Sequence, residues 1–289
     1  MTFLENVDKK QLQKILIIAI SALTLVAMVL LLVVIILGVG PKAPVKVDID
    51  FGTLKVTDKE LSTGSLILAD EDHPYTADEE LIELVGCQTY RNEQMTLEGI
   101  PLEKSNNKYI PYKPMQLEVT AMAAAHKMLS AAKDAVGEKA VTIDAAYGYI
   151  IYTGVETDEY NTGMLMFLSD YNSETGAYVA LSDAYSKWFD NNAVNYGFIE
   201  SFEDAYRYVG AAHAKYMADA DFTLAEYIEH LKTNTNYEKM IVVEIDDVKY
   251  ASYYVACAAD DEIKVPANNE YVISGTNEGG VVVTVKLDK

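Results

Sequence analysis

Residues 188–199 read WFDNNAVNYGFI, and the fold assignment rests first on this stretch. Ser182 is a suitable N-cap for a helix that begins shortly before it, because a serine hydroxyl accepts a hydrogen bond from an otherwise free N–H group of the first turn. Gly197 is a suitable end, since glycine readily adopts the left-handed conformation that follows a last turn. Between the two, a mostly aromatic set of side chains falls on one side: Tyr185, Trp188, Phe189, Asn192 and Tyr196.

Apolar periodicity predicts further elements of a core. Met115 to Val136 is rich in alanine and methionine, and its apolar positions share one helical face: Leu117, Ala121, Ala124, Met128, Ala132 and Val136. Val141 to Tyr152 is β-branched and aromatic enough for a strand. Gly163 to Ser169 contains an unbroken apolar run, which predicts a central strand buried on both faces.

The C-terminal part changes character after a last helix. Thr223 and Glu226 form a capping box, which opens a helix through Leu231. Four short alternating strands are expected after Asn234, with a turn at Gly279-Gly280: Met240 to Ile245, Tyr250 to Ala256, Tyr271 to Ser274 and Val281 to Leu287. These strands predict a small β extension.

Two strands are expected before the core. Val45, Val47, Ile49 and Phe51 alternate with charged residues, so this segment reads as a half-buried strand that packs with the β extension. Gly64 to Ala69 reads as a short apolar strand that runs into an acidic turn.

An apolar run from Ile15 to Leu37 carries no charged residue. At about 1.5 Å per helical residue it is long enough to cross the roughly 30 Å hydrocarbon core of a bilayer. It lacks the short apolar region and the cleavage site of a signal peptide. Lys9, Lys10 and Lys14 precede it, which favours a cytoplasmic N-terminus. We expect a cytoplasmic tail at 1–14, a transmembrane anchor at 15–40, and the rest of the chain outside the cell membrane.

The chain has a formal net charge of −21. Nucleic acid is therefore excluded as a partner, because phosphate binding requires a basic surface. A flat docking on anionic lipid is disfavoured for the same reason. The two cysteines, Cys87 and Cys257, do not form a metal-binding pair, and the sequence leaves open whether they form a disulfide.

Several motifs resemble those of one enzyme family. Residues 188–199 are similar to Trp-Leu-x-x-Asn-Ala-x-x-Tyr-Gly-Phe, and residues 206–214, YRYVGAAHA, are similar to Phe-Arg-Tyr-Val-Gly-x-x-His-Ala, both found in zinc D-alanyl-D-alanine carboxypeptidases of the VanY type. The resemblance implies an α+β fold with a D,D-carboxypeptidase-like domain at 64–233. A linker with the first strand at 41–63 precedes this domain, and the β extension at 234–289 follows it.

The same resemblance locates the zinc ligands, and here they are replaced. Residues 157–167, TDEYNTGMLMF, match the family's Ser-x-His-x-x-Gly-x-x-x-Asp, so that Tyr160 falls on the ligand His and Phe167 on the ligand Asp. Ala205 falls on the third ligand, a His, and Phe202 on the catalytic Glu. Zinc hydrolysis needs about three protein ligands, an open position for water and a base. We therefore expect no catalytic residue, no metal ligand and no cofactor.

Other chemistry finds little support. Gly148 takes the place of the family's substrate-binding Arg. The histidines do not show ligand spacing, and no nucleophile elbow, P-loop or dinucleotide fingerprint is present. Asp158 and Glu159 are adjacent carboxylates that read as part of a solvated loop.

What remains by the family's layout is an aromatic cleft with an arginine nearby, which is suited to a peptide or a sugar: Tyr147, Tyr149, Tyr152, Tyr160 and Arg207. An equally good interpretation is that these tyrosines only fill the space that zinc and substrate left.

Three functions stay open. The leading hypothesis is a membrane-anchored extracytoplasmic pseudoenzyme that binds cell-wall peptide or an envelope protein. The first alternative is an active zinc D,D-carboxypeptidase that trims peptidoglycan stem peptides. The second is a structural subunit of an envelope assembly, for which the cleft is irrelevant.

Overall fold

The structure, a computed structural model, describes residues 16, 19–24, 28, 41–87, 115–137, 140–148, 157–172 and 177–287. It divides into two compact units, residues 1–42 with 219–221 and residues 43–218 with 222–289. Within the described residues, no helix is long and apolar enough to cross a membrane. Most of the run from Ile15 to Leu37 lies outside them, so the anchor stays a prediction. All named strands lie in the second unit, to which the following paragraphs refer.

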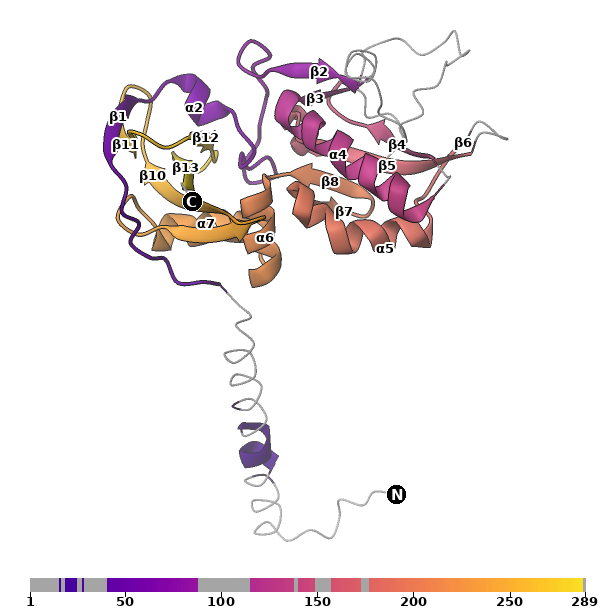
Figure 1. The fold of residues 1–289 in the computed structure, drawn as a ribbon, viewed down its shortest axis with the longest axis horizontal. Coiled ribbons are helices and arrows are strands. Elements are labelled where there is room, and N and C mark those ends of the chain that lie inside the picture. The colour runs from indigo at the N-terminus through magenta and orange to yellow at the C-terminus, as the bar shows by residue number, and fades with distance from the viewer. Residues whose placement is uncertain are drawn as a thin grey trace. The chain divides into compact units, whose positions relative to one another are not determined.

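One lobe of this unit, which we call the core lobe, is built on a five-stranded antiparallel sheet (Figure 1). Its strands run in the order β4 (Ala140–Ala145), β5 (Leu165–Asn172), β8 (Ala205–Tyr208) and β7 (Phe198–Phe202), with β6 (Ala177–Val179) also paired to β5. β5 is thus central, as the apolar run predicted. A two-stranded ladder of β2 (Leu84–Gly86) and β3 (Gln116–Glu118) leads into the long helix.

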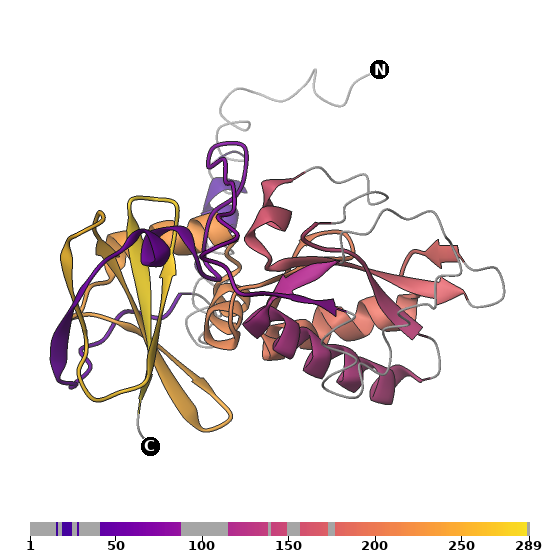
Figure 2. The same ribbon diagram turned by 90° about the horizontal axis from the view of Figure 1, so that it is seen from above.

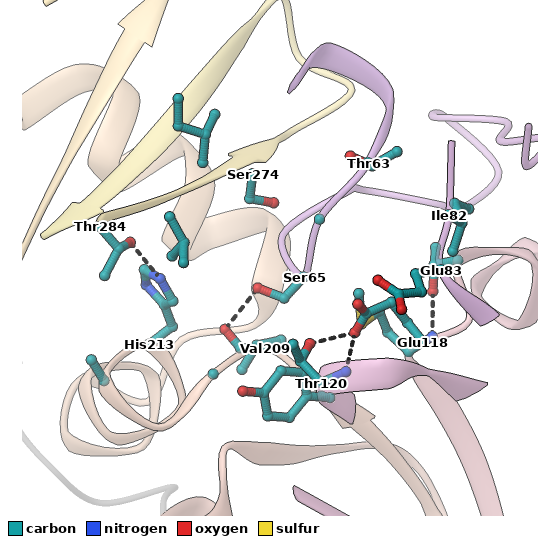
Figure 3. A pocket seen from close by; sticks show the side chains of 18 of the residues that line it. Thr63, Ser65, Ile82, Glu83, Glu118, Thr120, Val209, His213, Ser274 and Thr284 are labelled. Atoms are coloured by element: carbon teal, nitrogen blue, oxygen red, sulfur yellow. Dashed lines mark hydrogen bonds between the residues drawn. The ribbon is translucent and has the colours of Figure 1, made fainter. Parts of the chain in front are cut away.

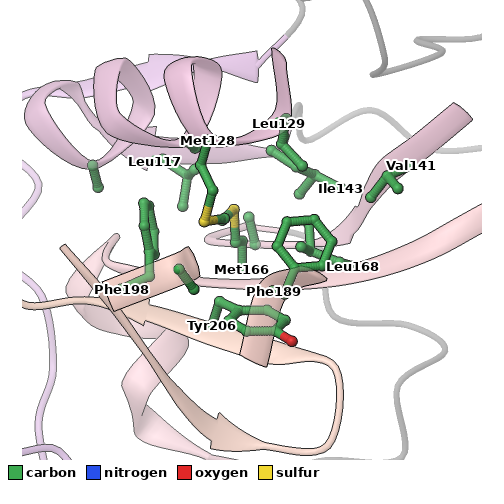
Figure 4. Packing of buried hydrophobic residues seen from close by; sticks show 14 of the residues in the cluster. Leu117, Met128, Leu129, Val141, Ile143, Met166, Leu168, Phe189, Phe198 and Tyr206 are labelled. Atoms are coloured by element: carbon green, nitrogen blue, oxygen red, sulfur yellow. The ribbon is translucent and has the colours of Figure 1, made fainter. Parts of the chain in front are cut away.

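Two helices, α4 (Val119–Val136) and α5 (Asp183–Asn192), pack on one face of the sheet. The predicted face of α4 is buried at Ala121, Met128 and Ala132. Met166 and Leu168 of β5 meet it from the sheet side (Figure 4). The core of this lobe therefore lies between the helices and one face of the sheet.

The helix expected between Ser182 and Gly197 is confirmed. Ser182 is the N-cap of α5 by position, but its hydroxyl makes no capping hydrogen bond, and the helix continues into the 3-10 turn η2 (Ala193–Tyr196). Gly197 follows with φ +88, and an added Cβ would lie 2.8 Å from the backbone nitrogen of Ala211. Only glycine fits here, because the left-handed backbone and the close approach both exclude a side chain.

The C-terminal lobe contains the β extension. Its four-stranded antiparallel sheet runs in the order β12 (Tyr271–Gly275), β13 (Gly280–Leu287), β10 (Val248–Ala256) and β9 (Ile241–Ile245). All four predicted strands are present. A further ladder joins β1 (Phe51–Lys55) to β11 (Glu262–Pro266), which the sequence did not predict. The first strand therefore begins at Phe51 and belongs to the C-terminal lobe, and Val45 contributes only an isolated bridge to Met240.

Three helices complete the C-terminal lobe: α2 (Asp58–Ser62), α6 (Ala211–Ala220) and α7 (Leu224–Asn234). α7 begins with the predicted capping box, in which Thr223 N donates to Glu226 Oε2 at 2.8 Å. Figure 2 shows α6 and α7 beside the four-stranded sheet. His213 of α6 hydrogen-bonds Thr284 of β13, with 2.9 Å between Nε2 and Oγ1.

Two expectations are corrected or settled by the fold. The segment from Gly64 to Ala69 is not a strand but an irregular buried segment, because its backbone groups pair outside any ladder. Leu66 N donates to Ser274 Oγ at 2.8 Å, and Leu68 N donates to the Thr276 carbonyl at 3.0 Å. Cys87 and Cys257 do not form a disulfide.

Candidate functional site

The site is on the sheet face that α4 and α5 leave free. Side chains alternate between the two faces of a strand, so Leu165 and Phe167 of β5 point away from the helix-covered face. Phe167 lies opposite Ala205 of β8 and opposite Ala145 of β4. The topology thus brings two positions matched to zinc ligands, Phe167 and Ala205, onto one face.

The 3-10 turn η1 (Asp158–Thr162) adds the third position. Thr157 caps it by accepting a hydrogen bond from Glu159 N, and Gly163 ends it with φ +71. An added Cβ on Gly163 would lie 2.8 Å from Leu84 Cδ2, so the turn requires glycine here. Tyr160 is 0% exposed and packs with the sheet. The cluster, which we call the vacated site, consists of Ala145, Tyr160, Leu165 and Ala205 with the half-buried Phe167.

The chemistry of these side chains does not fit a zinc ion. Zinc in proteins is held by histidine nitrogen, cysteine sulfur or carboxylate oxygen. Phe167 and Ala205 have no donor atom, and a neutral phenol such as that of Tyr160 is a poor ligand near pH 7. Across the described residues, no group of three or more His, Cys, Asp or Glu side chains is placed to hold a metal.

Phe202 is the residue that the sequence resemblance matches to the family's catalytic base. It lies at the end of β7, opposite Ala205 after an irregularity in the register, and the residue is 38% exposed. A phenyl ring takes up no proton, so this position offers no general base. Gly148, at the position of the substrate-binding Arg, lies in a turn with φ +82.

The predicted aromatic cleft is only partly described. Tyr160 is buried in the vacated site, whereas Tyr147 does not pack against it and donates a hydrogen bond to Glu79 Oε1 at 2.5 Å. Burial, together with the Glu79 carboxylate, raises the pKa of Tyr147 to about 12. Tyr149 and Tyr152 lie outside the described residues, so a cleft formed by the four tyrosines stays a prediction.

Arg207 is fully buried on the same face as the vacated site. Its Nη2 donates to the Ile67 carbonyl at 2.6 Å, and its Nη1 donates to Glu159 Oε2 at 3.4 Å. Burial lowers the pKa of Arg207, and the Glu159 carboxylate opposes that shift. The guanidinium therefore joins the Ile67 segment and η1 to the sheet, and a role in ligand binding stays a prediction.

Glu159 was expected on a solvated loop, and that expectation is wrong. Its side chain is only 17% exposed, and Oε2 also accepts a hydrogen bond from Ser201 Oγ at 3.1 Å. No local pattern indicates this role, because Glu159 and Arg207 are 48 positions apart in the chain.

A pocket of about 490 Å³ lies elsewhere in the second unit, between the two lobes (Figure 3). The C-terminal lobe lines it with Val272, Ile273 and Ser274 of β12 and with Thr284 of β13. Its other walls include Glu83, Glu118, Thr120, Thr162, Met164 and Tyr208 of the core lobe. None of the residues of the vacated site lines it. No pattern in the sequence indicates this pocket, because its residues come from separate segments.

Comparisons with known proteins agree with this fold. No protein-family model matches the chain. A segment is 38% identical over 112 residues to a D-alanyl-D-alanine carboxypeptidase of Enterococcus faecium. The match covers 34% of this chain and 36% of that protein, so the chain spans about a third of its curated relative.

Solved structures also resemble the chain. The vancomycin resistance D,D-dipeptidase VanXYg, in complex with a D-Ala-D-Ala phosphinate analogue, aligns with a TM-score of 0.61 and 19% identity, over 82% of this chain and all of that one. The zinc complex of the vancomycin resistance D,D-pentapeptidase VanY aligns with a TM-score of 0.38 and 15% identity, over 57% of this chain and 98% of that one. The chain therefore has the fold of VanXYg, and one segment of it is similar in sequence to a D-alanyl-D-alanine carboxypeptidase.

Proposed function

We propose that the chain belongs to the VanY-type D,D-carboxypeptidase family as a pseudoenzyme, which binds cell-wall peptide or an envelope protein without hydrolysing it. The observation that carries the proposal is the vacated site, where the three positions matched to zinc ligands meet in one apolar cluster. Their convergence on one sheet face supports the proposal that these are the positions of the ligands. The side chains at these positions supply no set of donors for zinc.

The loss extends beyond the metal ligands. Peptide hydrolysis at zinc needs a carboxylate to take the proton of the attacking water, and Phe202 offers none. Gripping a substrate carboxylate calls for an arginine or a comparable donor, and Gly148 has no side chain. Each step of the family's reaction thus lacks its residue in this chain.

A peptide is the ligand class that the relatives favour. VanXYg was solved with an analogue of D-Ala-D-Ala. The related segment of this chain matches a protein named for the same dipeptide. Binding a peptide requires neither an attacking water nor a base. A chain that keeps the fold but lacks the catalytic residues can therefore still recognise a peptide.

We also propose that the N-terminal run from Ile15 to Leu37 anchors the chain in the cell membrane, with residues 1–14 in the cytoplasm. The length of the apolar run and the lysines before it support this arrangement. Protease added to intact protoplasts should then degrade the acidic C-terminal part. An epitope tag at residue 1 should stay protected until the membrane is opened, and digestion of that tag in intact cells would contradict the orientation.

The experiment that tests the pseudoenzyme compares zinc content with D-alanine release. The purified full-length chain is exposed to zinc, freed of excess metal and analysed for metal. It is then incubated with a peptide that ends in D-Ala-D-Ala. We expect less than about 0.1 zinc per chain and no D-alanine above background, given a site without ligands. About one zinc per chain, with release of D-alanine that a chelator abolishes, would establish the active enzyme instead.

A further inference from the structure

The pocket between the lobes has features that the vacated site lacks. One of its walls is β12, which pairs with β13 on one side and with no other described strand. Edge strands present backbone N–H and C=O groups that can pair with an added strand. The pocket therefore combines a cavity of about 490 Å³ with a strand edge.

The direction of the β12 backbone groups follows from two hydrogen bonds. Gly275 N donates to the Thr63 carbonyl at 2.8 Å, so its N–H points away from β13. The Glu270 carbonyl accepts a hydrogen bond from Lys286 N of β13 at 2.8 Å, so the backbone groups of Glu270 point toward β13. Because orientation alternates along a strand, Tyr271 and Ile273 direct their N–H and C=O groups to the outer edge.

Only part of this edge is covered. The Thr63 contact closes it at Gly275, and Leu66 N donates to the side chain of Ser274. The stretch before these residues is more open, since Tyr271 and Val272 are 36% and 66% exposed. Tyr271 and Ile273 are thus the two residues whose backbone groups can receive a further strand.

The opposite wall of the pocket is acidic (Figure 3). Glu83 and Glu118 line it, and Glu83 is exposed. Glu118 caps α4 through Oε2, which accepts from Thr120 N at 2.7 Å and from Ala121 N at 3.2 Å. Lys59 of α2 also lines the pocket, so two carboxylates face one ammonium group, and the remaining negative charge favours a ligand that carries a positive charge.

A carbohydrate is a poorer match for this pocket. Hydroxyl groups line it, but several already have partners within the protein. Ser65 Oγ donates to the Val209 carbonyl at 3.1 Å, and Thr162 Oγ1 donates to the Glu159 carbonyl at 2.6 Å. Thr284 Oγ1 hydrogen-bonds His213 at 2.9 Å. The groups that remain are the outer backbone groups of β12 and the two carboxylates. A ligand that pairs with backbone groups and presents an ammonium group matches them.

We infer that this pocket binds an extended peptide as an added strand on β12, with an ammonium-bearing side chain directed to Glu83 and Glu118. Strand addition of this kind takes affinity from main-chain hydrogen bonds and specificity from alternate side chains. The inference does not depend on the proposed function, because the pocket shares no residue with the vacated site.

The test uses the full-length chain in mild detergent and the blocked peptide acetyl-Val-Lys-Val-Lys-Val-amide, with amide hydrogen exchange as the first readout. We expect saturable binding, with slower exchange at Tyr271 and Ile273. The amides of Val272 and Ser274, already directed to β13, should change little. Protection confined to another part of the chain, or no binding at about 1 mM peptide, would overturn the inference.

Modified peptides test the hydrogen bonding. One analogue is N-methylated at its valine amides and another at its lysine amides. In an added strand only one of these two sets faces β12, so one analogue should bind at least about tenfold more weakly and the other like the parent. Equal binding of both analogues and the parent would exclude strand addition.

Charge variants test the acidic wall. Glu83→Gln should weaken binding about three- to fivefold, whereas Glu80→Gln, at an exposed acid outside the pocket lining, should leave it within about twofold. A peptide with glutamate in place of lysine should not bind. Equal affinity of the two variants for the peptide would show that Glu83 does not recognise the ammonium group. The zinc and D-alanine measurements are separate, so failure here leaves the proposed function untouched.

Discussion

Phe167 lies directly opposite Ala205 across the antiparallel pair of β5 and β8. The residues come from distant parts of the chain, yet the register makes them neighbours on one sheet face, where Tyr160 joins them. In a zinc enzyme this convergence would assemble the ligands. Here it assembles carbon atoms and one phenol, so the replacements are compatible with each other as a packed cluster.

A carboxylate returned to position 167 should destabilise the fold. Phe167→Asp removes a ring from the vacated site and places a charge beside buried Ala205 and Tyr160. We expect a loss of about 3 kcal/mol in the free energy of unfolding. Urea unfolding followed by fluorescence of Trp188 measures it. Phe167→Leu is the matched control and should cost less than about 1.5 kcal/mol. Equal stability of the two variants would show that water reaches this position.

Restoring all three ligand types should restore metal binding but not activity. The variant that combines Tyr160→His, Phe167→Asp and Ala205→His is expected to bind about one zinc per chain and to become more stable when zinc is added. D-alanine release should stay absent, because Phe202 and Gly148 are unchanged. Metal analysis and thermal unfolding with and without zinc check this. Failure of the triple variant to bind zinc, while folded, would contradict the assignment of these positions.

Arg207 should matter for stability more than its place beside the site suggests. Arg207→Met leaves Glu159 without its guanidinium partner and the Ile67 carbonyl without its donor. Breaking a buried pair in this way costs about 3 to 5 kcal/mol. Glu159→Gln is the milder control, because its side chain is partly exposed and keeps an oxygen that can accept a hydrogen bond. A loss of stability no larger than that of the control would show that the buried guanidinium is dispensable.

Local signals in the sequence predicted the elements that local interactions form. The capping box of Thr223 and Glu226, the end of the helix at Gly197 and the central strand β5 are examples, since each depends on residues close in the chain. Periodicity also identified four strands of the C-terminal lobe. These predictions succeed because propensity and tertiary structure agree at these places.

The features that the sequence did not predict correctly depend on contacts between distant segments. The segment from Gly64 to Ala69 has the composition of a strand, but its carbonyls meet the Arg207 guanidinium and its N–H groups meet Ser274 and Thr276. β11 forms against β1, about 200 positions away. The family motifs pointed to the residues of the vacated site, whose role stays a prediction, whereas no motif marks the pocket beside β12.

Lowering the pH should reduce the stability of the fold, because the buried His213 resists protonation in the folded state. This side chain is buried, and its ring nitrogens lie 2.8 Å from the Tyr227 hydroxyl and 2.9 Å from Thr284 Oγ1. Burial lowers its pKa to about 4, below the ordinary value of 6.5. Between these two values the unfolded chain binds the proton and the folded chain does not, so stability falls as the pH falls.

The size of this effect can be measured against a variant. At 1.36 kcal/mol per pKa unit, the loss attributable to His213 approaches about 3 kcal/mol near pH 4. Carboxylates also titrate at acid pH, so the difference between the unmodified chain and His213→Gln isolates the histidine. We expect the variant to be less stable at pH 7, because the ring's packing is lost, but to lose less stability between pH 6.5 and 4. Parallel stability profiles for the two proteins would mean that His213 binds its proton equally well in the folded and unfolded states.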